Sequence, residues 1–226
     1  MRHRINGIVL NYIRYSESSV IVKIYTDLFG LQGYIVNNVR SSKPKHPIAL
    51  FQPVTQLEFI GYHNYSGKLN RVTEIRIRHA YSDIPFNVRK STVAIFLSEV
   101  LLKTLQEETS NPDLFEFLSR SFSAYDGMKK NYQNFHIRFL FRYLKYIGLE
   151  LTDPETLFET KQGARLYSFL DDGVLGHLLR DPYGSPSSLT HLQRRDLAEI
   201  LVSFIARNLH IDNNFKSLQV LKEVFE

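Results

Sequence analysis

The sequence contains no cysteine among its 226 residues. This absence excludes disulfide bonds, metal sites built from thiolates, and catalysis by a cysteine nucleophile. A zinc finger therefore cannot form in this chain. The absence is compatible with any cellular compartment and does not by itself identify one.

Proline and glycine are scarce and scattered, at eight and eleven residues, so a low-complexity linker or a repeat array is excluded. Long apolar runs are missing as well. Behind the basic N-terminus the apolar stretch is broken by Asn11, Arg14 and Glu17, which makes it too short and too polar for a signal peptide or a membrane span. We therefore expect a soluble cytoplasmic protein with no membrane association.

Catalytic signatures are also missing. None of the eight histidines has the spacing of a helical zinc site, and there is no phosphate-binding glycine loop, dinucleotide fingerprint or serine elbow. Asp171 and Asp172 could act as a carboxylate pair, but two acids before Gly173 more commonly form a turn. We expect no enzyme, no bound metal and no cofactor.

What the chain does have is an uneven distribution of charge. Residues 1–80 hold 11 basic and 4 acidic residues, a net charge of +7, whereas the remaining 17 basic and 19 acidic residues give −2. A basic surface gains free energy by releasing the counterions condensed on nucleic acid. The first part of the chain is therefore a candidate phosphate-binding module.

The first part also has the pattern of strands, with short runs rich in Val, Ile, Tyr and Phe between turn formers. The expected strands are about residues 5–14, 18–26, 31–39, 53–62 and 68–79. In the last strand, period-2 alternation places Thr73, Ile75 and Ile77 on the core side and Glu74, Arg76 and Arg78 on the solvent side. Five short strands predict a closed barrel of the oligonucleotide-binding (OB) type, with an SH3-like barrel as the competing fold.

From Asn87 the apolar period becomes helical. Helices are predicted at about residues 88–107, from Asn111-Pro112 onwards, at 132–147, at 190–209 and at 214–225. Between them, Asp171-Asp172-Gly173, Gly176 and Asp181-Pro182-Tyr183-Gly184 indicate turns. The predicted fold class is α+β, with a five-stranded OB-type barrel at residues 1–80 and an all-α domain at residues 81–226.

The candidate DNA contacts are the basic residues of the barrel. Arg40, Lys43 and Lys45 lie in a proline-containing loop between two strands, although a purely solvated loop would look similar. The supporting residues are Arg14, Lys23, Arg71, Arg76 and Arg78. Tyr12, Tyr15, Tyr25 and Tyr34 could stack on bases, although tyrosines with this pattern more often belong to the core and edges of a barrel. No signature of base readout is visible, so binding should be largely independent of sequence.

The order of motifs along the chain resembles the bacterial RecO family of recombination and repair proteins. The matching segments in the barrel are Gly7-Ile8-Val9-Leu10, residues 15–22, residues 26–31, the basic loop at 40–45 and Phe51-Gln52-Pro53. Those in the helical part are residues 111–115, Phe139–Leu144 with Gly148-Leu149, and Lys216-Ser217-Leu218 with Leu221. The chain departs from the pattern at residues 159–180, where many members place four zinc-binding cysteines. Apolar residues such as Leu166, Tyr167, Phe169 and Leu175 must hold this segment instead.

The resemblance implies a non-enzymatic mediator that binds single- and double-stranded DNA. It would anneal complementary strands and assist recombinase loading onto DNA coated with single-strand-binding protein. The implied partners are RecR, RecF in some settings, and the acidic C-terminal tail of the single-strand-binding protein. By this analogy the barrel contacts DNA and RecR, and the helical domain receives the tail in an apolar groove bordered by Lys or Arg.

Two other interpretations remain open at this point. A protein-interaction scaffold, whose basic barrel binds an acidic protein, predicts no stoichiometric DNA binding at physiological salt. An RNA-binding module predicts a preference for RNA over DNA of the same sequence, through contacts to the 2′-hydroxyl groups.

Overall fold

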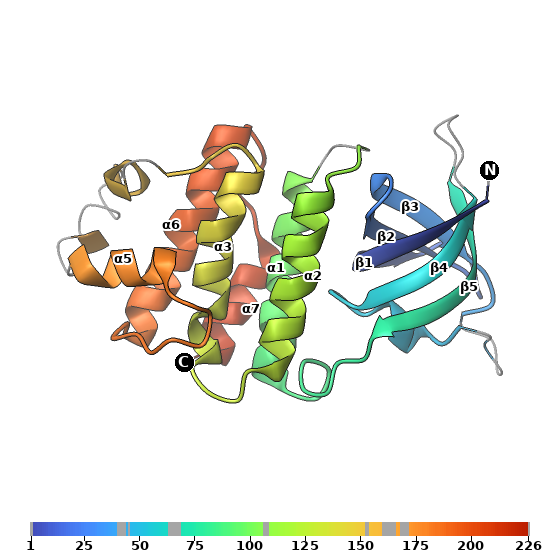
Figure 1. Cartoon of the computed structure of the whole chain (residues 1–226), viewed down its shortest axis with the longest axis horizontal. Helices are drawn as coiled ribbons and strands as arrows, with labels where there is room; N and C mark the ends of the chain where they lie inside the picture. Colours follow the sequence, from blue (N-terminus) through green and yellow to red (C-terminus); the bar gives the residue numbers. More distant parts are fainter. Residues whose placement is uncertain are drawn as a thin grey trace. The chain divides into compact units, whose positions relative to one another are not determined.

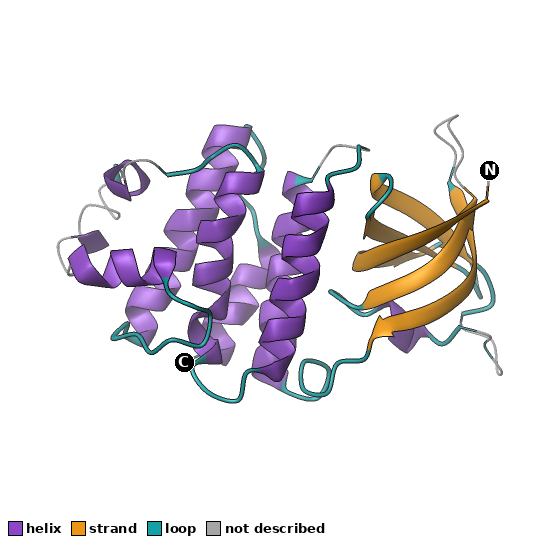
Figure 2. Cartoon of the chain, viewed as in Figure 1, coloured by secondary structure: helices purple, strands orange, loops and turns teal. Residues whose placement is uncertain are grey.

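The computed structural model describes residues 2–39, 44, 46–62, 69–105, 109–151, 154–159, 166–167 and 172–225. All five strands precede the first α-helix in the sequence (Figure 1), and Figure 2 distinguishes the strands from the helices. The strands are β1 (Arg2–Arg14), β2 (Val20–Thr26), β3 (Gly30–Val36), β4 (Gln56–Tyr62) and β5 (Asn70–His79). The α-helices are α1 (Val88–Thr104), α2 (Pro112–Gly127), α3 (Phe135–Tyr146), α5 (Asp172–Arg180), α6 (His191–Leu209) and α7 (Lys216–Val224). Short 3-10 turns are η1 (Ile48–Phe51), η2 (Tyr132–Asn134) and η3 (Pro154–Phe158).

The strands form a closed barrel in the order β1-β2-β3-β5-β4. The long strand β1 pairs with both β2 and β4, and all pairings are antiparallel except the short parallel one between β3 and β5. This confirms the predicted OB-like barrel and the helical region that follows it. Closure gives β1 two partners in turn, β4 along its first half (Arg2–Ile8) and β2 along its second half (Gly7–Arg14).

Inward-facing side chains fill the barrel. The buried cluster comprises Ile5, Val9, Val20, Val22, Ile24, Tyr34, Val36, Val39, Phe51, Leu57 and Phe59. Val20, Val22 and Ile24 alternate along β2, as period-2 geometry requires. Gly61 leaves room for this packing, because a Cβ there would lie 2.6 Å from Ile5 Cδ1.

Strand β5 corrects one prediction about side-chain faces. Two bulges interrupt its pairing with β4, and Glu74 has a left-handed φ of 53°. An extra residue shifts the alternation by one position, so Val72 and Ile75 both pack against the core. Ile77 is 47% exposed, and its predicted place in the core is wrong.

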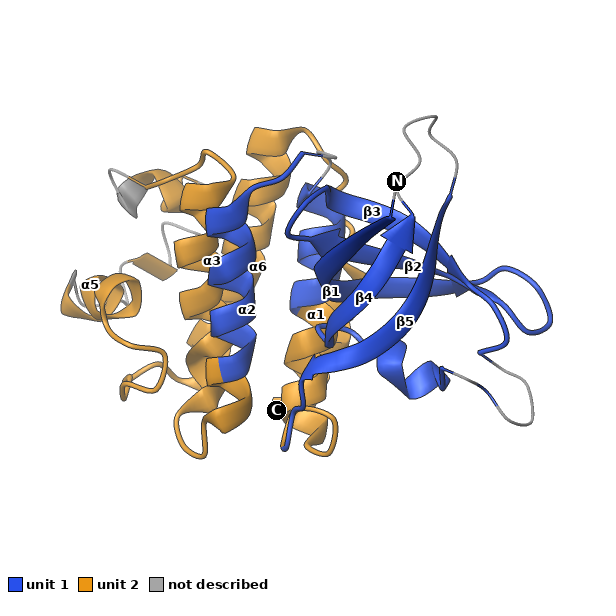
Figure 3. Ribbon diagram, turned by 45° about the vertical axis from the view of Figure 1, so that its right-hand side comes forward, with its two compact units in different colours: residues 1–82, 97–123 blue, residues 83–96, 124–226 orange. Residues whose placement is uncertain are grey.

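The described chain divides into two compact units, and the boundary passes through α1 and α2 (Figure 3). The first unit combines residues 1–82 with residues 97–123. Gln56 of β4 donates to Ser119 O at 2.9 Å, and Tyr25 of β2 stacks on Phe115 with ring centroids 6.4 Å apart. These contacts attach the α2 segment to the barrel. The domain division at residue 80 stays a prediction.

The second unit contains residues 83–96 and 124–226. The fully buried Lys90 links its first two segments, donating to Tyr125 O and Asp126 O at 2.9 Å each and pairing with Asp83 at 2.8 Å. The hydrogen bond from Lys90 is the main reason that the pKa of Asp83 is lowered below its ordinary value.

Helix ends follow the sequence closely. Asn111 caps α2 by accepting from Leu114 N at 3.0 Å, as predicted. Thr190 and Gln193 form a capping box at the start of α6.

No helix in the described part of the chain is long and apolar enough to cross a membrane.

Helix α5 corrects two predicted turns, because Asp172-Gly173 and Gly176 lie inside this helix instead. Leu175 and Leu178 are both buried there at helical spacing, and their burial outweighs the helix cost of its glycines, about 1 kcal/mol each. The predicted turn at residues 181–184 is confirmed, since Ser185 N donates to Pro182 O at 3.1 Å. Asp171 and Phe169 lie outside the described residues.

The described residues of η3, 166–167, α5 and the turn after α5 are held by packing and by two arginines of α3. Leu166 is buried, and Tyr167 lies against Phe158 with ring centroids 5.1 Å apart. The fully buried Arg138 of α3 donates to His177 O at 2.7 Å and to Asp181 O at 3.1 Å. The side chain of Arg142 lies over the Tyr183 ring at 4.2 Å. A cation from α3 thus satisfies several backbone carbonyls of this segment.

Candidate nucleic-acid interface

Three of the predicted cations lie exposed on strands of the barrel. Lys23 is on β2 and Arg71 on β5, and Arg14 ends β1. Lys23 extends over the bare backbone of its neighbour Gly33, since a Cβ on Gly33 would lie 3.7 Å from the Lys23 Nζ. None of the three cations forms an ion pair within the described part of the chain. Their charge is therefore available to a ligand.

Arg76 differs, because an acid already compensates it. It donates to Glu58 at 2.5 Å, and Arg4 pairs with the same carboxylate at 3.3 Å. Arg2 pairs with Glu74. Sequence reasoning missed Arg2 and Arg4, since only the pairing of β1 with β4 brings Arg4 beside Glu58. The outer surface of β1, β4 and β5 is a mixed-charge network with a basic excess.

Arg78 has a packing partner instead of an acid. Its guanidinium carbon lies 5.7 Å from the centroid of the Phe115 ring of α2. A cation over an aromatic face is attracted by the ring quadrupole. Arg78 therefore contributes to the attachment of the α2 segment to the barrel, in addition to its predicted role.

The three loop cations, Arg40, Lys43 and Lys45, lie outside the described residues. The residue before them is placed: Val39 N donates to Ser18 O at 2.9 Å, and the Val39 side chain is part of the barrel core. The chain thus enters the basic loop beside the connection between β1 and β2.

Two of the four candidate stacking tyrosines are unavailable to bases. Tyr34 is fully inside the barrel, where burial raises the pKa of its hydroxyl, and Tyr25 is covered by Phe115. Tyr12 packs partly against the core. Only Tyr15 of this group, in the connection after β1, is largely exposed, at 58%.

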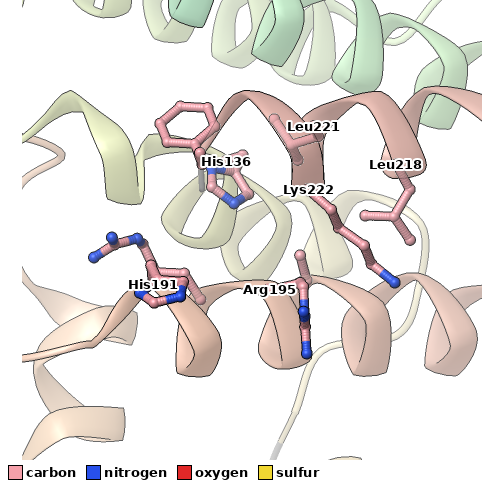
Figure 4. A pocket seen from close by; sticks show the side chains of 9 residues that line it. His136, His191, Arg195, Leu218, Leu221 and Lys222 are labelled. Atoms are coloured by element: carbon pink, nitrogen blue, oxygen red, sulfur yellow. The ribbon is translucent and has the colours of Figure 1, made fainter.

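A separate pocket lies in the second unit, between α3, α6 and α7 (Figure 4). Its apolar lining is Ala198, Leu218, Leu221 and Phe225, and its basic lining is His136, His191, Arg194, Arg195 and Lys222. In Figure 4 the labelled side chains of α6 and α7 approach the pocket from opposite sides. No carboxylate is among these lining residues, although Glu199 pairs with Lys222 at 2.9 Å.

His136 is the buried titratable group of this pocket. Burial, together with the positive charge of Arg194, lowers the pKa of His136 to about 3, so its ring is neutral at physiological pH. His136 Nδ1 and Arg194 Nε are buried and have no hydrogen-bond partner among the described residues. An incoming polar group could satisfy such atoms, whose isolation is costly.

No group of His, Asp and Glu in the described chain could hold a metal ion.

A closed OB-like barrel with exposed cations, followed by a helical region, defines a barrel-and-helix protein whose barrel surface can attract phosphate groups. Comparison with known families agrees with this class. Residues 1–81 match the sequence model described as Recombination protein O N terminal, and residues 85–153 match the one described as Recombination protein O C terminal.

Full-length relatives support the same assignment. The DNA repair protein RecO of Flavobacterium psychrophilum is 32% identical over 244 residues, covering 100% of both chains. That of Flavobacterium johnsoniae is 32% identical over 239 residues, also covering 100% of both. That of Bacteroides fragilis is 30% identical over 236 residues, covering 97% of this chain and 98% of its own. The chain belongs to the RecO family of DNA repair and recombination proteins, which are non-enzymatic mediators.

Proposed function

We propose that this protein binds single- and double-stranded DNA through its barrel, anneals complementary strands, and assists recombinase loading onto DNA coated with single-strand-binding protein. The observation that carries the proposal is the set of exposed cations without an acidic partner among the described residues: Arg14, Lys23 and Arg71. Arg40, Lys43 and Lys45, which lie outside the described residues, extend the proposed set. Arg76 and Arg78 complete the proposed interface.

The proposed mechanism is electrostatic. Each phosphate neutralised by Lys or Arg releases condensed counterions, and this term does not depend on base sequence. Two strands held against cations repel each other less, so complementary bases meet more often and pairing is faster. The buried positions of Tyr25 and Tyr34 favour this electrostatic mode over base stacking by these two residues.

We further propose that the pocket between α3, α6 and α7 receives the acidic C-terminal tail of the single-strand-binding protein. Such a tail carries apolar and acidic groups, and the pocket offers Leu218, Leu221 and Phe225 beside a basic lining. In that lining Arg194 has no acidic partner among the described residues, whereas Lys222 pairs with Glu199 and Arg195 with Asp196. The test is a titration with a labelled tail peptide. Lys222→Glu should weaken peptide binding at least about tenfold, whereas Lys216→Glu, at the start of the same helix and outside the pocket lining, should not.

The proposed protein partners on the barrel side are RecR and, in some settings, RecF.

The proposal that the barrel binds DNA is tested by fluorescence anisotropy with a labelled oligonucleotide, as single strand and as duplex, over a series of salt concentrations. Binding that weakens linearly with the logarithm of salt supports phosphate contact. If the chain does not bind DNA stoichiometrically at physiological salt, the result would favour the protein-interaction scaffold. If it binds RNA more tightly than DNA of the same sequence, the result would favour an RNA-binding module.

A further inference from the structure

The outer surface of the barrel carries a row of isoleucines across three neighbouring strands. Ile13 of β1 pairs with Ile21 of β2, and Ile21 pairs with Ile35 of β3. The row ends at Arg71 of β5, which pairs with Ile35. Residues that alternate with these isoleucines face the core, namely Val20, Val22, Tyr34 and Val36. The isoleucines must therefore face outwards.

This row is open to solvent in the chain as described. Ile13 is 57% exposed, and Ile21 and Ile35 are partly exposed. Leu69, which is 41% exposed, enlarges the apolar area, because its Cδ2 lies 3.3 Å from the place a Cβ of Gly33 would occupy. Contiguous exposed apolar residues on one face are characteristic of interaction surfaces.

The chemistry of the row favours protein over nucleic acid. Barrels of this type bind oligonucleotides on the face of their second and third strands, where aromatic side chains stack on bases. On this chain the outward neighbours of Lys23 along β2 are Ile21 and Tyr25, and the Tyr25 ring is already covered by Phe115. On β3 the positions opposite are Gly33 and Ile35, which have no π-face. Branched aliphatic side chains pack best against other apolar side chains.

The charges beside the row indicate the character of the partner. Lys23 and Arg71 border the isoleucines and have no acidic partner among the described residues. In a symmetric pair of two copies, the same patch faces itself, so these cations would lie against their own equivalents and repel. A partner with carboxylates around an apolar centre would compensate them.

We propose that the outer face of β1, β2 and β3 is a docking surface for a protein whose contact surface has an apolar centre bordered by Asp or Glu. The inference rests on the proposed function, which includes a protein partner of the barrel, and it assigns a surface to that partner. Lys23 and Arg71 then contact phosphate in the free chain and carboxylate in the complex. DNA and the partner consequently compete for this part of the barrel.

The experiment uses the full chain, the cognate RecR as the protein probe and a labelled single-stranded oligonucleotide as the DNA probe. The test variant replaces Ile13, Ile21 and Ile35 with Thr, which preserves both β-branching and net charge. The matched control is Ile77→Thr, because Ile77 is similarly exposed and lies outside the row. The single variant Ile13→Thr changes only the most exposed isoleucine of the row. It therefore still tests the docking surface if the triple variant does not fold.

We expect the triple variant to lose at least about tenfold in RecR affinity, and Ile13→Thr to lose affinity in the same direction. The salt dependence of DNA binding should not change in either, and Ile77→Thr should behave as the wild type. Wild-type RecR affinity in both row variants would overturn the inference while the proposed function stands. Loss of DNA binding with intact RecR binding would assign the face to nucleic acid. If the wild-type chain does not bind RecR, RecR would be excluded both as the partner in the proposed function and as the ligand of this docking surface.

Discussion

Arg76 lies 2.5 Å from Glu58, so its positive charge is already matched by an acid on the neighbouring strand. Lys23 and Arg71 have no such acid among the described residues. The sequence shows all three residues only as basic, but on the folded barrel they differ in whether an acid compensates their charge. This difference gives the first prediction.

We expect Lys23→Ala and Arg71→Ala each to reduce the salt dependence of single-strand binding by about 0.7 in the slope of log K against log salt. Arg76→Ala should change the slope less, because the Glu58 carboxylate, 2.5 Å away, already compensates part of the Arg76 charge. Anisotropy titrations at several salt concentrations measure the three slopes. Equal losses for all three variants would contradict the distinction between free and paired cations.

Glu58→Gln provides the complementary prediction. Removing the carboxylate releases Arg4 and Arg76 from their shared partner, whose side chain is 21% exposed. DNA binding should become tighter and its salt dependence steeper, by up to about 0.7 in slope for each released cation. Glu17→Gln is the matched control, since it changes the net charge equally in the connection after β1. The same gain in both variants would show that only net charge matters.

The buried His136 should make the stability of the chain dependent on pH. Its folded-state pKa is about 3, whereas an unfolded histidine titrates near about 6.5, so the unfolded state takes up the proton first on acidification. This contribution to stability is fully present above about pH 6.5 and is lost as the pH falls towards 3. Between pH 7 and pH 5 the loss amounts to about 2 kcal/mol.

Denaturant unfolding at pH 7 and pH 5 measures this loss. We expect His136→Gln, which cannot titrate, to reduce the difference in unfolding free energy between the two pH values. His191→Gln is the control, because that ring is exposed on α6. An unchanged pH dependence in the His136 variant would show that other groups cause it.

Arg138 should be essential for the segment that follows α5. Arg138→Met should lower the unfolding free energy by about 3 kcal/mol, because carbonyls of His177 and Asp181 lose a buried charged donor. Arg138→Lys should recover only part of this, since a compact ammonium cannot reproduce the planar fork of donors. Hydrogen exchange at residues 177–186 should accelerate in both variants. Protection equal to that of the wild type would contradict this role.

The sequence predicted the barrel because its strands obey simple alternation, as Val20, Val22 and Ile24 illustrate. It failed along β5, where two bulges and the left-handed Glu74 shift the faces. It failed at Gly176 as well, because burial of Leu175 and Leu178 decides the local structure against the propensity of one glycine. In each case a tertiary contact outweighs a local signal.

The candidate site was predictable only in part, for a related reason. The sequence shows that Lys23, Arg71 and Arg76 are basic, but only strand pairing shows that Arg76 lies beside Glu58. The isoleucine row likewise arises from the register of three strands that are separate in the sequence. Chemical character can be inferred from single residues, whereas neighbours across a sheet depend on the closed barrel.

The most direct test of the account is the annealing rate of two complementary DNA strands coated with cognate single-strand-binding protein, measured with and without this chain over a salt series. We predict acceleration that fades as salt rises, and a weaker acceleration for the combined Lys23→Ala and Arg71→Ala variant. A folded wild-type chain that does not accelerate annealing at any salt concentration would contradict the central claim.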